Sequence, residues 1–165
     1  MVALVDLCRE HAEFERSAYE VDGQASRLSA ALFSSAPLLH AWVAAVSGIS
    51  IGYATASREY STWGAREYLH MDCLFVRAQH RGAGVGAALL DSVVQFARAH
   101  GLNEVQWQTP NWNVDASRFY RRLGGVDQPK LRFVLHVAQD PGPHARVSEC
   151  DPRQLNVAIF LRGYP

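Results

Sequence analysis

Apolar residues in the first part of the chain recur at helical spacing. Over residues 3–19 they return every three or four positions, which predicts a helix with one apolar face. Residues 24–33 repeat this spacing and predict a second, shorter helix, which the segment Ser34-Ser35-Ala36-Pro37 ends. We therefore expect two helices before the first strand.

The next segments carry short apolar runs that are typical of strands. Residues 39–46 and 49–56 predict two strands joined at Ser47-Gly48, a pair that favours a two-residue hairpin turn. Residues 57–67 are polar and aromatic and are expected to form a loop. A third strand is predicted over residues 68–76.

A glycine-rich turn then opens into a helix, which Gly101 is well placed to cap at its C-terminus. Residues 104–108 alternate as a strand does. Asn113 can cap a helix over residues 114–123, and residues 131–138 predict a further strand. This order predicts a single α/β domain, with a mixed, mostly antiparallel central sheet flanked by helices.

Composition and charge exclude several classes of partner. Of the 165 residues, 48% are hydrophobic and 19% charged, as in an ordinary globular domain. Lys plus Arg equal Asp plus Glu at 16 each, so no net field attracts nucleic acid or an acidic membrane. No apolar run approaches the roughly 20 residues of a membrane span, and a signal-peptide pattern is lacking. We expect neither a nucleic-acid nor a membrane partner.

The spacing of the cysteines and histidines indicates the redox state of the compartment and whether a metal site is expected. Cys8, Cys73 and Cys150 are far apart in the sequence, and no CxxC spacing occurs. This usage favours a reducing compartment, so a cytoplasmic location is expected. The seven histidines are scattered without ligand spacing, and no metal site is predicted.

The segment Arg81-Gly82-Ala83-Gly84-Val85-Gly86-Ala87 is the most informative in the chain. Glycines between a strand and a helix can bring backbone N–H groups against an anion, where the helix dipole also favours negative charge. The segment lacks the Lys-Ser or Lys-Thr of a Walker A loop and the acidic residue of a dinucleotide fold. A glycine-rich connector that only permits tight packing is the simpler alternative.

Two motifs in order resemble those of the GNAT superfamily of N-acetyltransferases. The spacing Arg81-x-x-Gly84-x-Gly86 is similar to that family's acyl-CoA pyrophosphate loop, and the segment from Asn113 to Gly124 supplies its Asn, Ala and aromatic-Tyr pattern. The resemblance covers residues 39–135. Within the superfamily the chain looks most like the diamine (spermidine/spermine) N-acetyltransferases.

The resemblance implies acetyl-CoA as co-substrate and assigns residues to it. The pyrophosphate would lie against Arg81, Gly82, Ala83, Gly84, Val85, Gly86 and Ala87. The sheet is expected to splay beside Leu74, Phe75 and Val76, whose backbone groups would pair with the pantetheine arm, and an N–H there would polarise the thioester. Asn113 and Ala116 complete the expected cofactor contacts.

Catalytic roles also follow from the resemblance. Tyr120 matches the general acid that protonates the departing thiolate. Asp72 stands where polyamine acetyltransferases carry a glutamate and is the candidate base, although a structural aspartate is an equal alternative. His70 ranks after Asp72 as a candidate base, with a plain strand residue as the alternative. Acidic residues near the first helices either attract a cationic amine or form a solvated face: Glu13, Glu15, Glu20 and Asp22.

The expected function is acetyl transfer from acetyl-CoA to a primary amine of a small, polyamine-like molecule, by direct attack in a ternary complex. Alternatives are an aminoglycoside-like antibiotic or a protein amine as acceptor, or a non-catalytic acyl-CoA-binding module. Residues 1–138 are expected to form the domain and residues 139–165 an extension. Its segment 156–162 would add an edge strand in its own subunit or in a partner, and a tail without a role in the fold is the alternative. A homodimer is also expected.

Overall fold

A computed structural model describes residues 1–137 of the chain. Residues 1–127 form one compact unit, which contains all the helices and strands given below. The predicted edge strand over residues 156–162, and with it the proposed C-terminal extension, lies outside the described residues.

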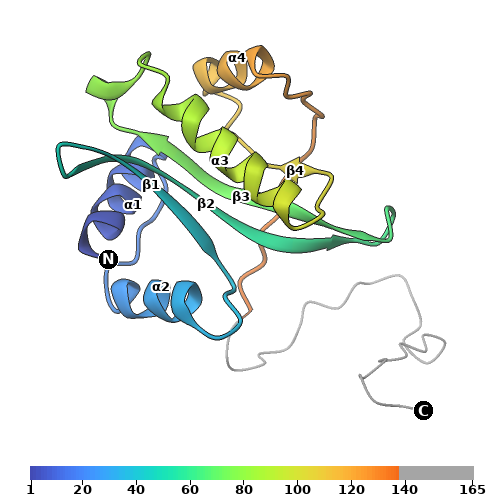
Figure 1. Ribbon diagram of the computed structural model, residues 1–165, viewed down its shortest axis with the longest axis horizontal. Helices are drawn as coiled ribbons and strands as arrows, with labels where there is room; N and C mark the ends of the chain where they lie inside the picture. Colours follow the sequence, from blue (N-terminus) through green and yellow to red (C-terminus); the bar gives the residue numbers. More distant parts are fainter. Residues whose placement is uncertain (138–165) are drawn as a thin grey trace, which may run out of the picture. The chain divides into compact units, whose positions relative to one another are not determined.

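The sheet contains four strands in the order β1-β2-β3-β4 (Figure 1). Its strands are β1 (His40–Val46), β2 (Ile49–Ser61), β3 (Arg66–Val76) and β4 (Val105–Gln106). The first three pair antiparallel, and β4 pairs parallel to β3. The predicted mixed, mostly antiparallel α/β sheet is confirmed.

The helices follow their predicted positions, with small changes at the ends. They are α1 (Val2–Glu15), α2 (Gln24–Phe33), α3 (Val85–Ala99) and α4 (Val114–Arg122), with a short 3-10 turn, η1 (Ala78–His80), before α3. Helix α1 ends before residue 19 because Arg16 adopts the left-handed conformation, with φ 58°, and its N–H caps the helix. None of the helices in residues 1–137 is long and apolar enough to cross a membrane.

The predicted loop over residues 57–67 is wrong. Strand β2 continues to Ser61 and β3 already begins at Arg66, so the connection is only four residues long. Cross-strand pairs hold this hairpin extension, among them Glu59 opposite Tyr68. Polar side chains concealed these strands because one face of the extension is exposed, and a half-exposed strand need not be apolar.

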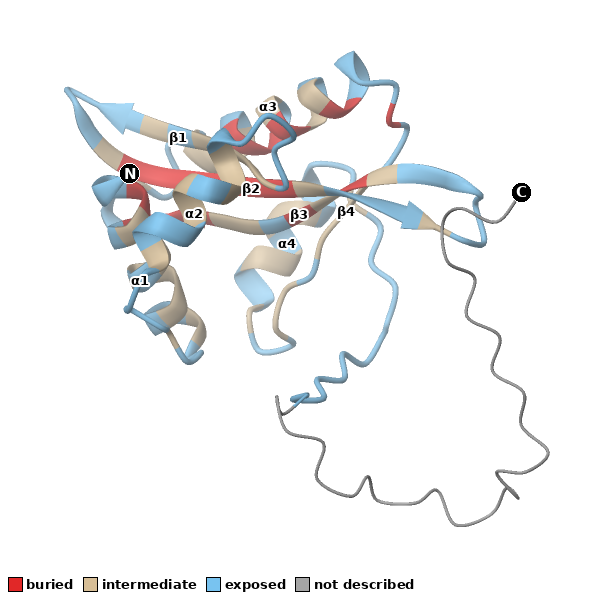
Figure 2. Cartoon of the chain, turned by 90° about the horizontal axis from the view of Figure 1, so that it is seen from below, coloured by how far each residue is buried: buried red, intermediate tan, exposed pale blue. Residues whose placement is uncertain are grey.

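Two apolar clusters cover opposite faces of the sheet (Figure 2). Helix α3 packs on one face through Leu89, Leu90, Val93 and Ala97, which contact Leu69 and Met71 among others. Helix α1 packs on the other face, where Leu4 and Leu7 contact Tyr53 and Phe75. Because side chains alternate along a strand, each residue of β3 belongs to one of these two faces.

The remaining strand predictions hold only in part. The strand expected over residues 104–108 is limited to Val105 and Gln106. Residues 131–137 form no regular strand, although their sequence alternates.

Candidate active site

The edge of β3 next to β4 opens at His70. In the described residues, β4 pairs with β3 only at Leu69–Val105 and His70–Gln106, and the chain then leaves the sheet toward α4. The segment from Met71 to Val76 therefore faces an opening on that side. This is the splay that the resemblance predicts.

Hydrogen-bond alternation shows which groups of β3 face the opening. The N–H of Arg77 donates to the Ile51 carbonyl at 2.9 Å, so Phe75 two residues earlier also directs its N–H and C=O toward β2. Leu74 and Val76 then direct theirs away from β2. Of the two expected N–H donors to a thioester, Leu74 rather than Phe75 is correctly oriented.

The glycine turn presents a row of free backbone donors. Gly82 and Gly84 have φ angles of 79° and 82°, a conformation that L side chains rarely adopt. The first helical bond of α3 runs from the Ala88 N–H to the Gly84 carbonyl. Within residues 1–137, the N–H groups of residues 82–87 have no protein acceptor. This row at a helix N-terminus fits a pyrophosphate.

Gly86 has a different role from the other two glycines. A Cβ atom at Gly86 would lie 3.2 Å from Cζ of Phe119 and 3.8 Å from Cδ2 of Leu74. Its missing side chain lets α4 pack against the first turn of α3. Space for Phe119, in addition to backbone approach to a phosphate, therefore explains this glycine.

Arg81 lies between the turn and α1. Its Nε donates to the Val76 carbonyl at 2.8 Å. Its guanidinium carbon lies 4.5 Å from the ring centre of Phe14 and 5.7 Å from that of Phe75. One hydrogen bond and two aromatic faces thus orient the cation while leaving further N–H groups for an anion.

Asn113 caps α4, as the sequence predicts. Its Oδ1 accepts a hydrogen bond from the Ala116 N–H at 3.2 Å. The cap occupies the Ala116 N–H, so a cofactor contact by Ala116 would not use that group. The Asn113 Nδ2 makes no hydrogen bond to the described residues and is the free donor at this position.

Tyr120 is held between aromatic neighbours with its hydroxyl free of protein hydrogen bonds in the described residues. Its ring centre lies 5.1 Å from those of Trp107 and Phe119. Burial raises the pKa of Tyr120 to about 12, with smaller contributions from Glu15 and Cys73. With its pKa raised in this way, the hydroxyl remains protonated at neutral pH.

Asp72 occupies a β-bulge. Cys73 lies opposite Thr55 and Met71 lies opposite Ala56, which leaves Asp72 as the extra residue of β3. Its side chain is exposed, and the Cys73 thiol donates to its Oδ2 at 3.5 Å. Burial, followed by the charge of Asp72, raises the pKa of Cys73 to about 12, so this residue is a neutral thiol at neutral pH.

Beside Asp72 lies a polar cluster that the sequence did not reveal. His11 of α1 shares a hydrogen bond of 3.0 Å between its Nδ1 and the Tyr53 hydroxyl, and its Nε2 lies 3.4 Å from Glu15. Its ring stacks on Phe75 with 5.1 Å between centres. Burial lowers the pKa of His11, which keeps the imidazole neutral. Only the packing of α1 against the sheet brings these residues together.

A second polar group missed by sequence lies on the β2–β3 extension. Glu59 accepts a hydrogen bond from the Tyr68 hydroxyl on Oε2, while its Oε1 lies 3.2 Å from Nδ1 of His70. The hydrogen bond to Glu59 raises the pKa of Tyr68 to about 12. Once residues 57–67 are assigned to strands, the pairing of Glu59 with Tyr68 and of Ser57 with His70 places this group on one face.

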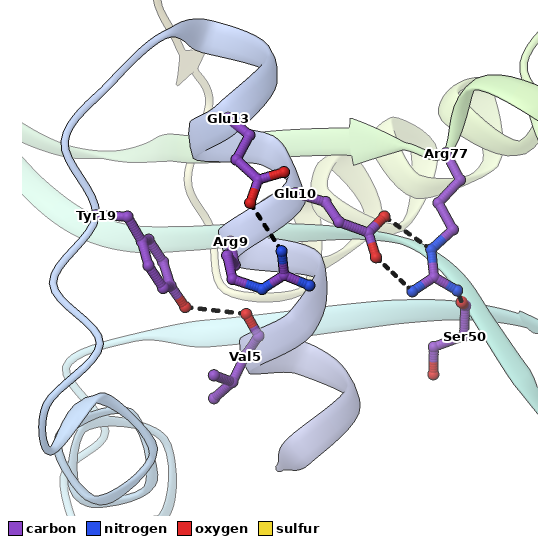
Figure 3. Close-up of polar contacts among 7 residues, drawn as sticks. All are labelled: Val5, Arg9, Glu10, Glu13, Tyr19, Ser50 and Arg77. Carbon is purple, nitrogen blue, oxygen red and sulfur yellow. Dashed lines mark hydrogen bonds and ion pairs between the residues drawn. The ribbon is translucent and has the colours of Figure 1, made fainter.

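A groove of about 500 Å³ lies between α1 and the end of β3. Glu10 and Arg77 line it and form a two-point ion pair with distances of 2.9 and 2.7 Å (Figure 3). Arg77 also donates to the Ser50 carbonyl at 2.8 Å. Arg81 lines the same groove, which therefore connects directly with the glycine turn.

Within residues 1–137, no group of three or more Asp, Glu, His or Cys side chains lies close enough together to hold a metal ion.

Comparison with known proteins agrees with this geometry. The model of the acetyltransferase (GNAT) family matches residues 4–125. A thialysine N-epsilon-acetyltransferase of Mus musculus is 28% identical over 132 residues, which cover 75% of this chain and 77% of the relative. An L-ornithine N5-acetyltransferase of Arabidopsis thaliana is 30% identical over 73 residues, covering 44% of this chain and 32% of that protein.

The fold is also shared with solved structures. An aminoglycoside acetyltransferase from an uncultured soil metagenomic sample, in complex with sisomicin, superimposes with a TM-score of 0.70 and 19% sequence identity. The match covers 83% of this chain and 88% of that one. At this identity the likeness establishes the fold.

Proposed function

We propose that this chain, which belongs to the acetyltransferase (GNAT) family, acetylates a primary amine of a small molecule that carries a second cationic group. It is an acetyltransferase enzyme, and its family uses acetyl-CoA as the acetyl donor. Diamines, polyamines and basic amino acids are the acceptor class. Two of its relatives are named as acetyltransferases of small amines of this kind, thialysine and ornithine.

The observation that carries the proposal is the alignment of three features along one side of β3. The free N–H row of residues 82–87 lies at one end, and the unpaired edge around Leu74 follows it. Tyr120 contributes a protonated hydroxyl, and its ring packs against the same apolar cluster as Leu74 of this strand. From Val76 back to Met71 the unpaired edge spans roughly 17 Å at about 3.3 Å per residue, so it extends past Leu74 on the side away from the glycine turn.

Each of these residues then has a separate role in the proposed reaction. Arg81 and the glycine turn bind the pyrophosphate, and the Leu74 N–H polarises the thioester carbonyl. Tyr120 donates its proton to the departing thiolate, since a neutral phenol is a suitable acid for a thiolate. Asp72 attracts and holds the ammonium group of the acceptor beside the thioester.

Negative charge near the reacting end supports a cationic acceptor. Asp72 is exposed, and the charge of Glu15 at the end of α1 contributes to the raised pKa of Tyr120. Their carboxylates favour an acceptor with two ammonium groups over one with a single charge. Of the acidic residues near the first helices, Glu15 is the one whose charge contributes to the raised pKa of Tyr120.

The test is a thiol-release assay with acetyl-CoA and matched acceptors. We expect release with spermidine, putrescine, ornithine and thialysine, and at least tenfold lower kcat/KM with butylamine, which lacks the second charge. Calorimetry with CoA separates binding from turnover. Binding without thiol release for any amine would favour the non-catalytic acyl-CoA-binding module, and absence of CoA binding would refute the proposal.

A further inference from the structure

His11 of α1 lies over the strand residue next to the position proposed for the thioester. Its ring stacks on that of Phe75, with 5.1 Å between the ring centres and 23° between the planes. Phe75 directly follows Leu74, whose N–H is proposed to polarise the thioester, so only about 3.3 Å of strand separates these two positions. His11 therefore borders the reacting end of the site on the face of the sheet that α1 covers.

The end of α1 reaches from β3 to the loop that precedes α4. The ring centre of Phe14 lies 6.4 Å from that of Phe75 and 5.7 Å from that of Trp112. The guanidinium carbon of Arg16 lies 5.3 Å from the ring centre of Trp112. Glu15 stands between Phe14 and Arg16 in the sequence, and therefore in the part of α1 that bridges β3 and the start of α4.

Two polar neighbours determine which ring nitrogen of His11 carries the proton. The Tyr53 hydroxyl lies 3.0 Å from Nδ1, and because burial raises the pKa of Tyr53 this hydroxyl keeps its proton. When it donates to Nδ1, the imidazole proton resides on Nε2, which lies 3.4 Å from Oε1 of Glu15. The opposite tautomer would direct the lone pair of Nε2 at the carboxylate, which is repulsive. The contacts thus favour an imidazole whose Nε2–H faces Glu15.

Glu15 differs from other paired glutamates near the start of the chain in the charge of its partner. Glu10, Glu13 and Glu20 each pair with an arginine, so a cation already compensates their charge. Burial lowers the pKa of His11, so the partner of Glu15 is a neutral imidazole. A neutral donor orients a carboxylate and leaves its negative charge for another cation. The Glu15 side chain is 31% exposed, so an ammonium group can reach it.

We propose that His11 is a positioning residue that sets the preference for a doubly charged acceptor, because it holds the Glu15 carboxylate where the second ammonium group binds. This role rests on the acetyltransferase function proposed above. Asp72 holds the ammonium group that reacts, and Glu15 binds the other one. An acceptor with a single amine has no group for Glu15 and gains nothing from this arrangement.

The test compares putrescine with butylamine, which has the same four-carbon chain but only one amine. The readout is the ratio of their kcat/KM values with acetyl-CoA as donor, expected to be at least about ten for the wild-type chain. Glu15→Gln should lower this ratio at least about fivefold, mainly through a higher KM for putrescine. Glu13→Gln is the matched control on the same helix and should keep the wild-type ratio, because Arg9 already pairs with Glu13.

Two substitutions of His11 separate positioning from packing. A glutamine can place an amide N–H near the position of Nε2, whereas the shorter asparagine reaches only that of Nδ1. We expect His11→Gln to keep the ratio within about twofold and His11→Asn to lower it about fivefold, with unchanged acetyl-CoA affinity in both. In a double variant, His11→Asn should not lower the ratio below that of Glu15→Gln alone, since the imidazole acts through this carboxylate.

Three results would overturn the role of His11 while leaving acetyl transfer intact. They are a wild-type ratio in His11→Asn, equal losses in His11→Asn and His11→Gln, and losses that multiply in the double variant. Absence of thiol release from the wild-type chain, or equal kcat/KM for putrescine and butylamine, would instead reject the proposed function, and this role with it.

Discussion

Cζ of Phe119 occupies the space next to Gly86, where a Cβ atom would lie only 3.2 Å away. Phe119 precedes Tyr120, so the first turn of α3 fixes the position of the proposed acid through this contact. Packing thereby couples the glycine turn, which is proposed to bind the pyrophosphate, to Tyr120, which is proposed to act as the acid.

Gly86→Val should therefore impair turnover more than cofactor binding. The added branches displace Phe119 and shift α4, and with it the Tyr120 hydroxyl. We expect kcat to fall at least tenfold, with a change in acetyl-CoA Kd of less than threefold. Ala88→Val, at an exposed position of the same helix, is the control for β-branching. Equal losses in both variants would contradict the coupling.

Arg81 should contribute to binding only through the phosphate end of the donor. Arg81→Ala is expected to weaken acetyl-CoA binding about tenfold, or roughly 1.4 kcal/mol. The same substitution should leave KM for S-acetylpantetheine unchanged, because that substrate has no pyrophosphate. A parallel loss with both donors would show that Arg81 acts by supporting β3 through the Val76 carbonyl. Arg81→Lys, which keeps the charge, should recover part of the affinity.

Removal of the Tyr120 hydroxyl tests the assigned acid. Tyr120→Phe should lower kcat about 100-fold and leave acetyl-CoA affinity unchanged. Because burial, Glu15 and Cys73 raise the pKa of Tyr120 to about 12, its proton stays in place throughout the assay range. The wild-type profile should thus show no loss of activity from this residue up to about pH 10. A kcat within twofold of wild type would remove Tyr120 from the mechanism.

Local signals in the sequence predicted the glycine turn and the cap of α4. The glycines at positions 82 and 84 require their positive φ angles, and Asn113 has the side chain that α4 uses as its cap. These features depend on neighbouring residues along the chain. The fold class and the family followed from them, whereas the homodimer and the cytoplasmic location stay predictions.

The missed residues depend on contacts between distant segments. His11 and Tyr53 are 42 residues apart, and only the docking of α1 brings them within a hydrogen bond. Glu59 meets His70 because β2 and β3 continue past the expected end of the sheet. The bulge that exposes Asp72 depends on the pairing register, which alternation alone does not specify.

Asn113 has a structural role and a proposed binding role, and two substitutions separate them. Asn113→Ala loses the cap, so the free energy of unfolding should fall by about 1 kcal/mol in a urea titration. Asn113→Asp keeps the capping oxygen but removes the Nδ2 donor. We expect it to retain stability and to bind acetyl-CoA about fivefold more weakly. Wild-type affinity in Asn113→Asp would restrict this residue to capping.

The ion pair between Glu10 and Arg77 should make stability depend on pH. Hydrogen bonds from Arg77 hold the pKa of Glu10 below its ordinary value of 4.5. A carboxyl with a lowered pKa stabilises the fold fully above its unfolded value, and this stabilisation disappears as the pH falls through its folded value. The contribution of the pair is therefore present at pH 7 and absent near pH 2.

Glu10→Gln should accordingly lower the free energy of unfolding by about 1 kcal/mol at pH 7 and by much less near pH 2. Glu13→Gln is the matched control on the same helix, because Glu13 pairs with Arg9 at 2.7 Å in an exposed position (Figure 3). That pair should contribute only about 0.3 kcal/mol. Urea titrations of both variants at the two pH values give the comparison. Equal effects at pH 7 would show that the bridge from α1 to β3 adds nothing beyond an ordinary surface ion pair.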